Sequence, residues 1–168
     1  LTDAKGNPLA NTDINWSSTP AGGTLSASST KTNTLGVATV TLSSADVIAF
    51  KVTASVGGAT ETSASLSFIA DTVTAKLATL VADKTASVVA GKDTVNLSAT
   101  VLDASNHPVQ GVTVSWSSDN ASGTFTPVSG VTDAAGVATA AFTETHAQTT
   151  VVTASITGSS LTQSLDVI

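Results

Sequence analysis

Residues 94–102 read Thr-Val-Asn-Leu-Ser-Ala-Thr-Val-Leu, a stretch in which polar and apolar side chains alternate. Side chains of an extended chain point alternately to the two faces of a sheet, so this stretch predicts a half-buried β-strand. Its inward face would carry Val95, Leu97, Ala99 and Val101. Other short stretches of this kind follow along the chain, separated by turn residues about every 8–12 positions, and that spacing is typical of a β-sandwich.

The composition also favours strands over helices. Of the 168 residues, 41% are apolar but only 11% are charged, and none is Arg. Helix faces are usually built from Leu, Glu, Lys, Arg and Gln, whereas Val and Thr, which prevail here, fit pleated strands. The fold class predicted from the sequence is therefore all-β.

Charge and cysteine content exclude several classes of function. The net charge of −6 would repel a phosphate backbone, so we expect neither nucleic acid nor an anionic membrane surface among the partners. The chain contains no Cys, which removes disulfides, thiolate chemistry and Cys-type metal sites. No apolar run approaches the ~18 residues that span a bilayer, so we expect no direct membrane insertion of this chain.

The chain repeats itself at an offset of 100 residues. Identical blocks are Trp-Ser-Ser at 16–18 and 116–118, Gly-Val-Ala-Thr at 36–39 and 136–139, and Val-Thr-Ala-Ser at 52–55 and 152–155. Because these blocks share one unbroken register, they indicate two copies of one module.

The second copy, residues 71–168, is predicted to be a complete domain. We expect seven strands in it, at 85–90, 94–102, 111–117, 123–126, 136–142, 149–157 and 161–168. Seven strands in about 95 residues indicate an immunoglobulin-like sandwich.

The first copy, residues 1–70, is predicted to be an incomplete domain. Leu1 aligns with Val101, so the first two strands of the module have no counterpart in this copy. We expect its core to lie open and the copy not to fold well as it stands, unless upstream residues or another chain supply the strands. The chain is thus interpreted as two tandem Ig-like β-sandwich domains, the first of them N-terminally truncated.

Trp16 and Trp116, the largest side chains, are predicted to be core residues. Each lies on an alternating strand, two positions after Ile14 in the first copy and Val114 in the second. A sandwich without a disulfide needs a bulky core centre, which favours this interpretation. The alternative is an exposed Trp that stacks on a sugar ring.

Pro8, Pro108, Asp133 and Gly136 are predicted turn residues. Pro fixes φ and cannot donate to a ladder, which keeps both prolines out of central strands. Asp133 and Gly136 take the first and fourth positions of a type I turn. The corresponding turn of the first copy, 33–36, begins with Asn, and we expect it to be less regular.

No residue is predicted to be catalytic, cofactor-binding or metal-binding. His107 and His146 lie in polar stretches without a partner at metal-ligand spacing, and the chain has no Gly-x-Ser-x-Gly motif. One alternative is a calcium ion that stiffens the junction of the domains, with Asp71, Asp103 and Asp133 as candidate ligands. Another is an isopeptide bond between Lys and Asn, for which no pair can be named.

The ordered motifs resemble a known family. Asp-Ala-x-x-x-Pro, Trp-Ser-Ser, a Gly-Thr pair, Thr-Asp-Ala-Ala-Gly-Val-Ala-Thr (132–139) and Val-Thr-Ala-Ser follow one another as in the bacterial immunoglobulin-like domains of group 1. Such domains form the tandem passenger of invasin- and intimin-type outer-membrane adhesins. The resemblance covers essentially all of both copies and implies a rod of repeated modules, without the Cys and aromatic residues of a lectin-like tip.

The resemblance implies a non-enzymatic stalk or spacer that projects a distal adhesive domain for cell adhesion. It places the chain at the cell surface, anchored in the outer membrane through the parent protein. The implied partners are neighbouring Ig-like domains of the same chain and, through the parent, a host cell-surface receptor. The joint at 70–75 lacks Gly and Pro and is not expected to be a flexible linker. Two alternatives stay open: a module that itself binds a host protein or glycan, and an accessory domain of a secreted polysaccharide-degrading enzyme.

Overall fold

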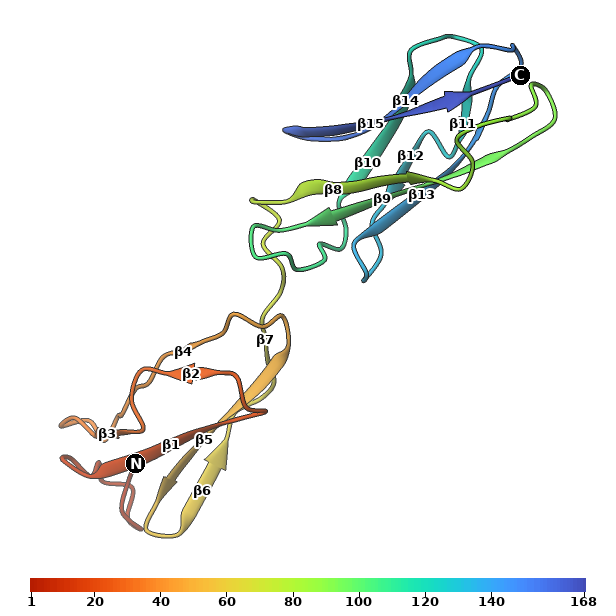
Figure 1. Ribbon diagram of the computed structural model, residues 1–168. Coiled ribbons are helices and arrows are strands. Elements are labelled where there is room, and N and C mark those ends of the chain that lie inside the picture. Colours follow the sequence, from red (N-terminus) through yellow and green to blue (C-terminus); the bar gives the residue numbers. More distant parts are fainter. The chain divides into compact units, whose positions relative to one another are not determined.

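The computed structural model describes the backbone of residues 1–168 and all side chains other than those at positions 163 and 164. The chain divides into two compact units, Leu1–Ile69 (unit 1) and Ala70–Ile168 (unit 2), and each is built from antiparallel strands (Figure 1). The predicted all-β fold with two sandwich domains is confirmed. Within the described chain, no helix is long and apolar enough to cross a membrane.

Unit 2 is a sandwich of two four-stranded sheets. One sheet has the order β11-β13-β9-β8 and the other β12-β10-β14-β15. The strands are β8 (Lys76–Ala82), β9 (Val95–Leu102), β10 (Thr113–Ser118), β11 (Thr124–Thr126), β12 (Ser129–Val131), β13 (Val137–Thr143), β14 (Thr149–Ile156) and β15 (Ser159–Asp166).

The core of unit 2 lies between the inward faces of these sheets. The alternation predicted for β9 is observed: Val95, Leu97, Ala99 and Val101 are all buried. Phe142 of β13 is fully buried and packs against Phe125 with ring centroids 4.8 Å apart. Such apolar burial contributes roughly 1.5–3 kcal/mol per large side chain and is the main stabilising term of the unit.

The prediction that residues 85–90 form the first strand is wrong. The first strand is β8, whose register against β9 shifts by one residue between Leu77 and Thr79. This bulge breaks the two-residue alternation, which hides the strand from a periodicity argument. Residues 85–90 instead run beside the end of β15, where only Val88 forms a bridge, parallel to Val167. The short strand β12, which contains a Gly, was also not predicted.

Unit 1 keeps one of the two sheets of this sandwich. Its strands are β1 (Asp13–Thr19), β2 (Thr24–Leu25), β3 (Ser29–Lys31), β4 (Leu42–Ser43), β5 (Ala49–Val56), β6 (Ala59–Thr62) and β7 (Leu66–Ser67). The sheet β3-β1-β5-β6, with β7 also on β5, corresponds to β12-β10-β14-β15. The second sheet is reduced to the pair β2-β4, and no described strand corresponds to β8 or β9.

The repeat loses its register near the end of unit 1. Trp16 pairs with Ala54 as Trp116 pairs with Ala154, so the offset of 100 holds through the middle of the sheet. Farther along, Phe50 pairs with Leu66, whereas Thr150 pairs with Leu165. One extra residue is accommodated around Ser63, whose hydroxyl accepts a hydrogen bond from the Val52 amide.

Candidate functional site

The two predicted tryptophans occupy equivalent places but differ in burial. Val114 and Trp116 are buried in the closed core of unit 2. Ile14 is also buried, whereas Trp16 is only half-buried because the face above it is open. The difference lies in what covers the residue, since both tryptophans lie on the same strand of the module.

The indole nitrogens of the two tryptophans also differ. Trp16 Nε1 donates a 2.7 Å hydrogen bond to Thr30 Oγ1 of β3. Among the described atoms, Trp116 Nε1 is buried without any partner. The residue at the Thr30 position in unit 2 is Gly130, which has no side chain to offer. A buried donor without an acceptor costs roughly 1–3 kcal/mol, so unit 2 carries a local defect that unit 1 does not.

Gly130→Thr is expected to stabilise unit 2 by about 1–3 kcal/mol, because it supplies an acceptor to Trp116 Nε1 and replaces Gly inside a strand. There is room, since a Cβ at Gly130 would approach the Thr139 carbonyl oxygen no closer than 3.4 Å. Urea unfolding followed by Trp116 fluorescence in a Trp16→Phe background measures the effect. The matched control is Gly130→Val, which has the same shape without the hydroxyl. Equal gains from Thr and Val would contradict the hydrogen bond.

Asp133 and Gly136 lie in a turn, whereas the two predicted turn prolines lie directly after one. Pro108 and Pro8 form equivalent isolated bridges, with Leu102 and Thr2 respectively. Asp133 Oδ1 accepts the amides of the second and fourth following residues at 2.9 and 3.0 Å, and Gly136 adopts φ 72°. The expectation of a less regular turn in unit 1 is wrong, because Asn33 Oδ1 makes the same two bonds at 2.9 and 3.1 Å. The Asn amide oxygen therefore accepts the same two hydrogen bonds as the Asp carboxylate oxygen, at nearly the same distances.

Asp103 is the most densely hydrogen-bonded carboxylate of unit 2. Only 4% of the residue is exposed, and its oxygens accept the amides of Ser105 at 2.8 Å and His107 at 2.9 Å. The His107 ring nitrogen Nδ1 lies 3.2 Å from Asp103 Oδ2. The bond from the His107 amide leads the interactions that lower the pKa of Asp103 to about 2. Hydrogen bonds to the ionised form favour it over the protonated form.

The Asp103 loop also holds the segment that precedes β8. The Asp71 amide donates to Asp103 Oδ2 at 3.2 Å, and the Ala104 amide donates to Thr74 Oγ1 at 3.2 Å. Ala70 belongs to the buried core of unit 2. Residues 70–74 are therefore an integral part of unit 2.

The candidate calcium ligands have other partners. Asp71 accepts bonds from the Val73 amide and the Thr74 hydroxyl, and Asp103 and Asp133 accept backbone amides of their own loops. Within the part of the chain that the structure describes, no three acidic or His side chains gather around a common point suited to a metal ion. The arrangement proposed as an alternative, three converging aspartates, is not found.

Glu144 is a buried carboxylate that sequence reasoning missed. The residue is 2% exposed, and its Oε1 accepts the amides of Thr145 at 2.8 Å and His146 at 3.1 Å. Burial opposes ionisation, but hydrogen bonds from Ser122 and from these amides outweigh it and lower the pKa of Glu144. The corresponding residue of the first copy is Ser44, so the repeat held no signal for this site.

Unit 2 is expected to lose stability in acid through Asp103. Its pKa falls from 3.8 to about 2 on folding, so the stabilisation is complete above pH 3.8 and disappears as the pH falls to about 2. Asp103→Asn should reduce the slope of unfolding free energy against pH in this window, and it should lower stability at pH 7. Asp133→Asn is the control, since Asn33 already fills that role in unit 1. Identical pH slopes for both variants would contradict the prediction.

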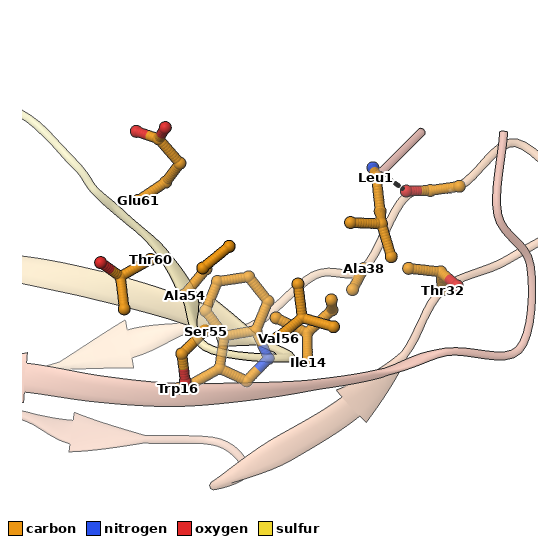
Figure 2. A pocket seen from close by; sticks show the side chains of 12 residues that line it. Leu1, Ile14, Trp16, Thr32, Ala38, Ala54, Ser55, Val56, Thr60 and Glu61 are labelled. Carbon is orange, nitrogen blue, oxygen red and sulfur yellow. Dashed lines mark hydrogen bonds between the residues drawn. The ribbon is translucent and has the colours of Figure 1, made fainter. Parts of the chain in front are cut away.

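An opening in unit 1 lies over its inner sheet face. This hollow of about 300 Å³ is lined mainly by apolar side chains, with a few hydroxyl groups and one carboxylate, and Figure 2 shows Trp16, Ile14 and Val56 at its floor with Glu61 at its rim. A neighbouring hollow continues over Trp16 toward Leu66 and Phe68. In unit 2, β8 and β9 cover the corresponding face.

Comparison with known proteins relates the chain to bacterial adhesins. The model of the bacterial Ig-like domain (group 1) matches residues 1–69 and 77–168. The inverse autotransporter adhesin YeeJ of Escherichia coli (strain K12) is 37% identical over 141 residues, which are 83% of this chain and 6% of that protein. The chain therefore spans only a small part of this curated relative.

Solved structures of adhesins share the fold. InvD of Yersinia pseudotuberculosis matches with a TM-score of 0.66 at 17% identity, over 99% of this chain and 50% of that one. The Escherichia coli adhesin FdeC matches with a TM-score of 0.60 at 24% identity, over 99% and 56%. The D0-D1 domain of intimin matches with a TM-score of 0.52 at 24% identity, over 100% and 87%. These likenesses support the Ig-like sandwich for both units.

Proposed function

The chain belongs to the bacterial Ig-like domain family (group 1), and from this premise we propose that its two domains are a section of the stalk of a bacterial surface adhesin. In this role they act as a non-enzymatic spacer that projects a distal adhesive domain. The observation that carries the proposal is the 37% identity to an inverse autotransporter adhesin, extending over most of both domains.

The structure supports a spacer in two further ways. The outward face of β10 carries the small polar side chains Thr113, Ser115 and Ser117, which solvate the surface. The segment 70–74 is bonded into unit 2 and is not a free linker. Repetition of such modules lengthens a protein without new chemistry.

The proposal places the chain outside the cell, anchored in the outer membrane through the parent protein. Its direct partners are the neighbouring Ig-like domains of the same chain. A host receptor would be contacted by a distal domain of the parent.

Replacement in the parent adhesin tests the spacer role. Deletion of residues 1–168 from the protein displayed on bacteria should reduce adhesion to host cells, because the tip is brought closer to the membrane. Two unrelated Ig-like domains of equal length, inserted in their place, should restore adhesion. Loss of adhesion that such a replacement fails to restore would overturn the spacer role and show that these domains bind a ligand themselves.

A further inference from the structure

The geometry points to an ester bond that unit 2 forms between the side chains of Thr150 and Asn120, with Glu144 as the base and ammonia as the leaving group. The bond joins the loop between β10 and β11 to the start of β14. This inference concerns a covalent change within unit 2 and is independent of the spacer role proposed above.

The hydroxyl of Thr150 lies in a buried site beside a carboxylate. Thr150 is 0% exposed, and its Oγ1 donates to Glu144 Oε2 at 3.4 Å. Burial raises the pKa of Glu144, but hydrogen bonds from the Ser122 hydroxyl and from backbone amides outweigh it and lower the pKa. The carboxylate is therefore ionised at neutral pH. A hydroxyl that donates to an ionised carboxylate is a nucleophile beside its general base.

The side chain of Asn120 brings a carboxamide to the same hydroxyl. Its Nδ2 donates to Thr150 Oγ1 at 2.8 Å. Its Oδ1 accepts the hydroxyl of Ser122 at 3.0 Å and the amide of Gly123 at 3.2 Å. Two donors on one carbonyl oxygen form an oxyanion hole, which stabilises the negative charge that this oxygen gains when the carbon beside it is attacked.

The backbone holds the two reacting side chains against each other. The Asp119 amide donates to the Val151 carbonyl at 3.1 Å, and the Val151 amide donates to Asp119 Oδ1 at 2.9 Å. Asn120 and Thr150 are the direct neighbours of this bonded pair in the sequence. Reactants that the fold holds in contact react far faster than the same groups free in solution.

Unit 1 shows that the fold does not require this cluster. Its residues at the equivalent positions are Pro20, Gly22, Ser44 and Phe50, in place of Asn120, Ser122, Glu144 and Thr150. Phe50 is fully buried and contacts Phe68 edge to face, with ring centroids 5.6 Å apart. Buried polar and charged groups are more costly than such an apolar filling. Unit 2 nevertheless has at these places all the groups that the reaction uses.

The reaction conserves atoms and charge. The Asn120 amide plane turns about the Cβ–Cγ bond, a soft torsion, so that Cγ faces Thr150 Oγ1. Oγ1 bonds to Cγ as its proton passes to Glu144, and an electron pair of the carbonyl moves to Oδ1. When this pair returns, the Cγ–Nδ2 bond breaks, and the nitrogen takes the proton from Glu144 and leaves as ammonia. The carboxylate is restored, and no further reactant is consumed.

The mass of the purified full chain tests the proposal. The main species should be lighter than the sequence requires by about 17 Da, the mass of the ammonia released when the acyl group passes to the hydroxyl. Cleavage before each Asp yields the peptides 119–132, with Asn120, and 133–165, with Thr150. They should stay joined after cleavage and separate in hydroxylamine, which cleaves esters. An unchanged mass would overturn the proposal, as would an ammonia loss confined to 119–132, which cyclisation of Asn120 would produce.

Three variants assign the roles of the residues. Thr150→Val keeps the shape of the side chain without the nucleophile, and Glu144→Gln removes the base, so both should keep the full mass and give two separate peptides. Thr149→Val is the matched control, because Thr149 is the exposed neighbour on the other face of β14, and this variant should lose ammonia as the native chain does. Ammonia loss that persists in Thr150→Val, or that disappears in Thr149→Val, would contradict the assignment. The mass of the native chain decides the proposal even where a variant does not fold.

Discussion

Phe142→Ala is expected to lower the free energy of unfolding of unit 2 by about 3–5 kcal/mol. The ring is fully buried, packs against Phe125 and lies directly beneath Gly123, so its removal leaves a cavity in the centre of the core. Small domains are stable by only about 5–15 kcal/mol, so a loss of this size would leave much of unit 2 unfolded at moderate urea concentrations. Urea unfolding followed by Trp116 fluorescence in the Trp16→Phe background gives the value.

The repeat supplies a matched control for this substitution. Leu42 takes the place of Phe142 in unit 1 but is only half-buried, because its own sheet is reduced to β2 and β4 and no described strand lies beside it where β9 lies beside Phe142. Leu42→Ala should cost less than about 1 kcal/mol, since little apolar area is lost. A cost for Leu42→Ala equal to that for Phe142→Ala would contradict the open core of unit 1.

Gly136→Ala is expected to destabilise unit 2 by about 2–4 kcal/mol. The residue adopts φ 72°, a conformation that costs an L-residue roughly 1–2 kcal/mol. An added Cβ would also approach the Val101 carbonyl oxygen to 2.5 Å, and that oxygen belongs to a central strand that cannot move freely. The same fluorescence measurement applies.

Gly91→Ala separates the two causes. Gly91 adopts a similar φ of 69°, but a Cβ there would meet no atom within 4 Å. This variant should show the conformational cost alone, about 1–2 kcal/mol. If both variants cost the same, the contact with the Val101 carbonyl is not part of the effect.

The sequence predicted the features that follow a regular period. The alternation in β9 and the repeat at offset 100 were sufficient for the fold class and for the open face of unit 1. The features that the sequence did not predict depend on single residues that interrupt the two-residue alternation or the offset of 100. The bulge near Leu77 hid β8, and the extra residue near Ser63 shifted the end of unit 1 against unit 2.

Contacts between distant residues were also invisible to sequence reasoning. The hydrogen bond from the Asp71 amide to Asp103 joins positions 32 residues apart, and no local pattern marks it. The missing acceptor of Trp116 follows from a Thr-to-Gly difference between the copies, and the sequence alone does not show that this position lies beside the strand of Trp116.

The segment beside the end of β15 has a mechanical consequence. The amides of Val88 and Ala90 donate to the carbonyls of Asp166 and Ile168, and the amides of Asp166 and Ile168 donate to the carbonyls of Thr85 and Val88. The two segments run parallel, so tension applied at Ala70 and at Ile168 slides one along the other and loads these four bonds together. Hydrogen bonds loaded in shear must all break simultaneously. In a hairpin pulled from its open end, by contrast, the hydrogen bonds break one after another. We therefore expect this parallel patch, whose Val88 and Val167 also belong to the buried core, to oppose the stretching of unit 2.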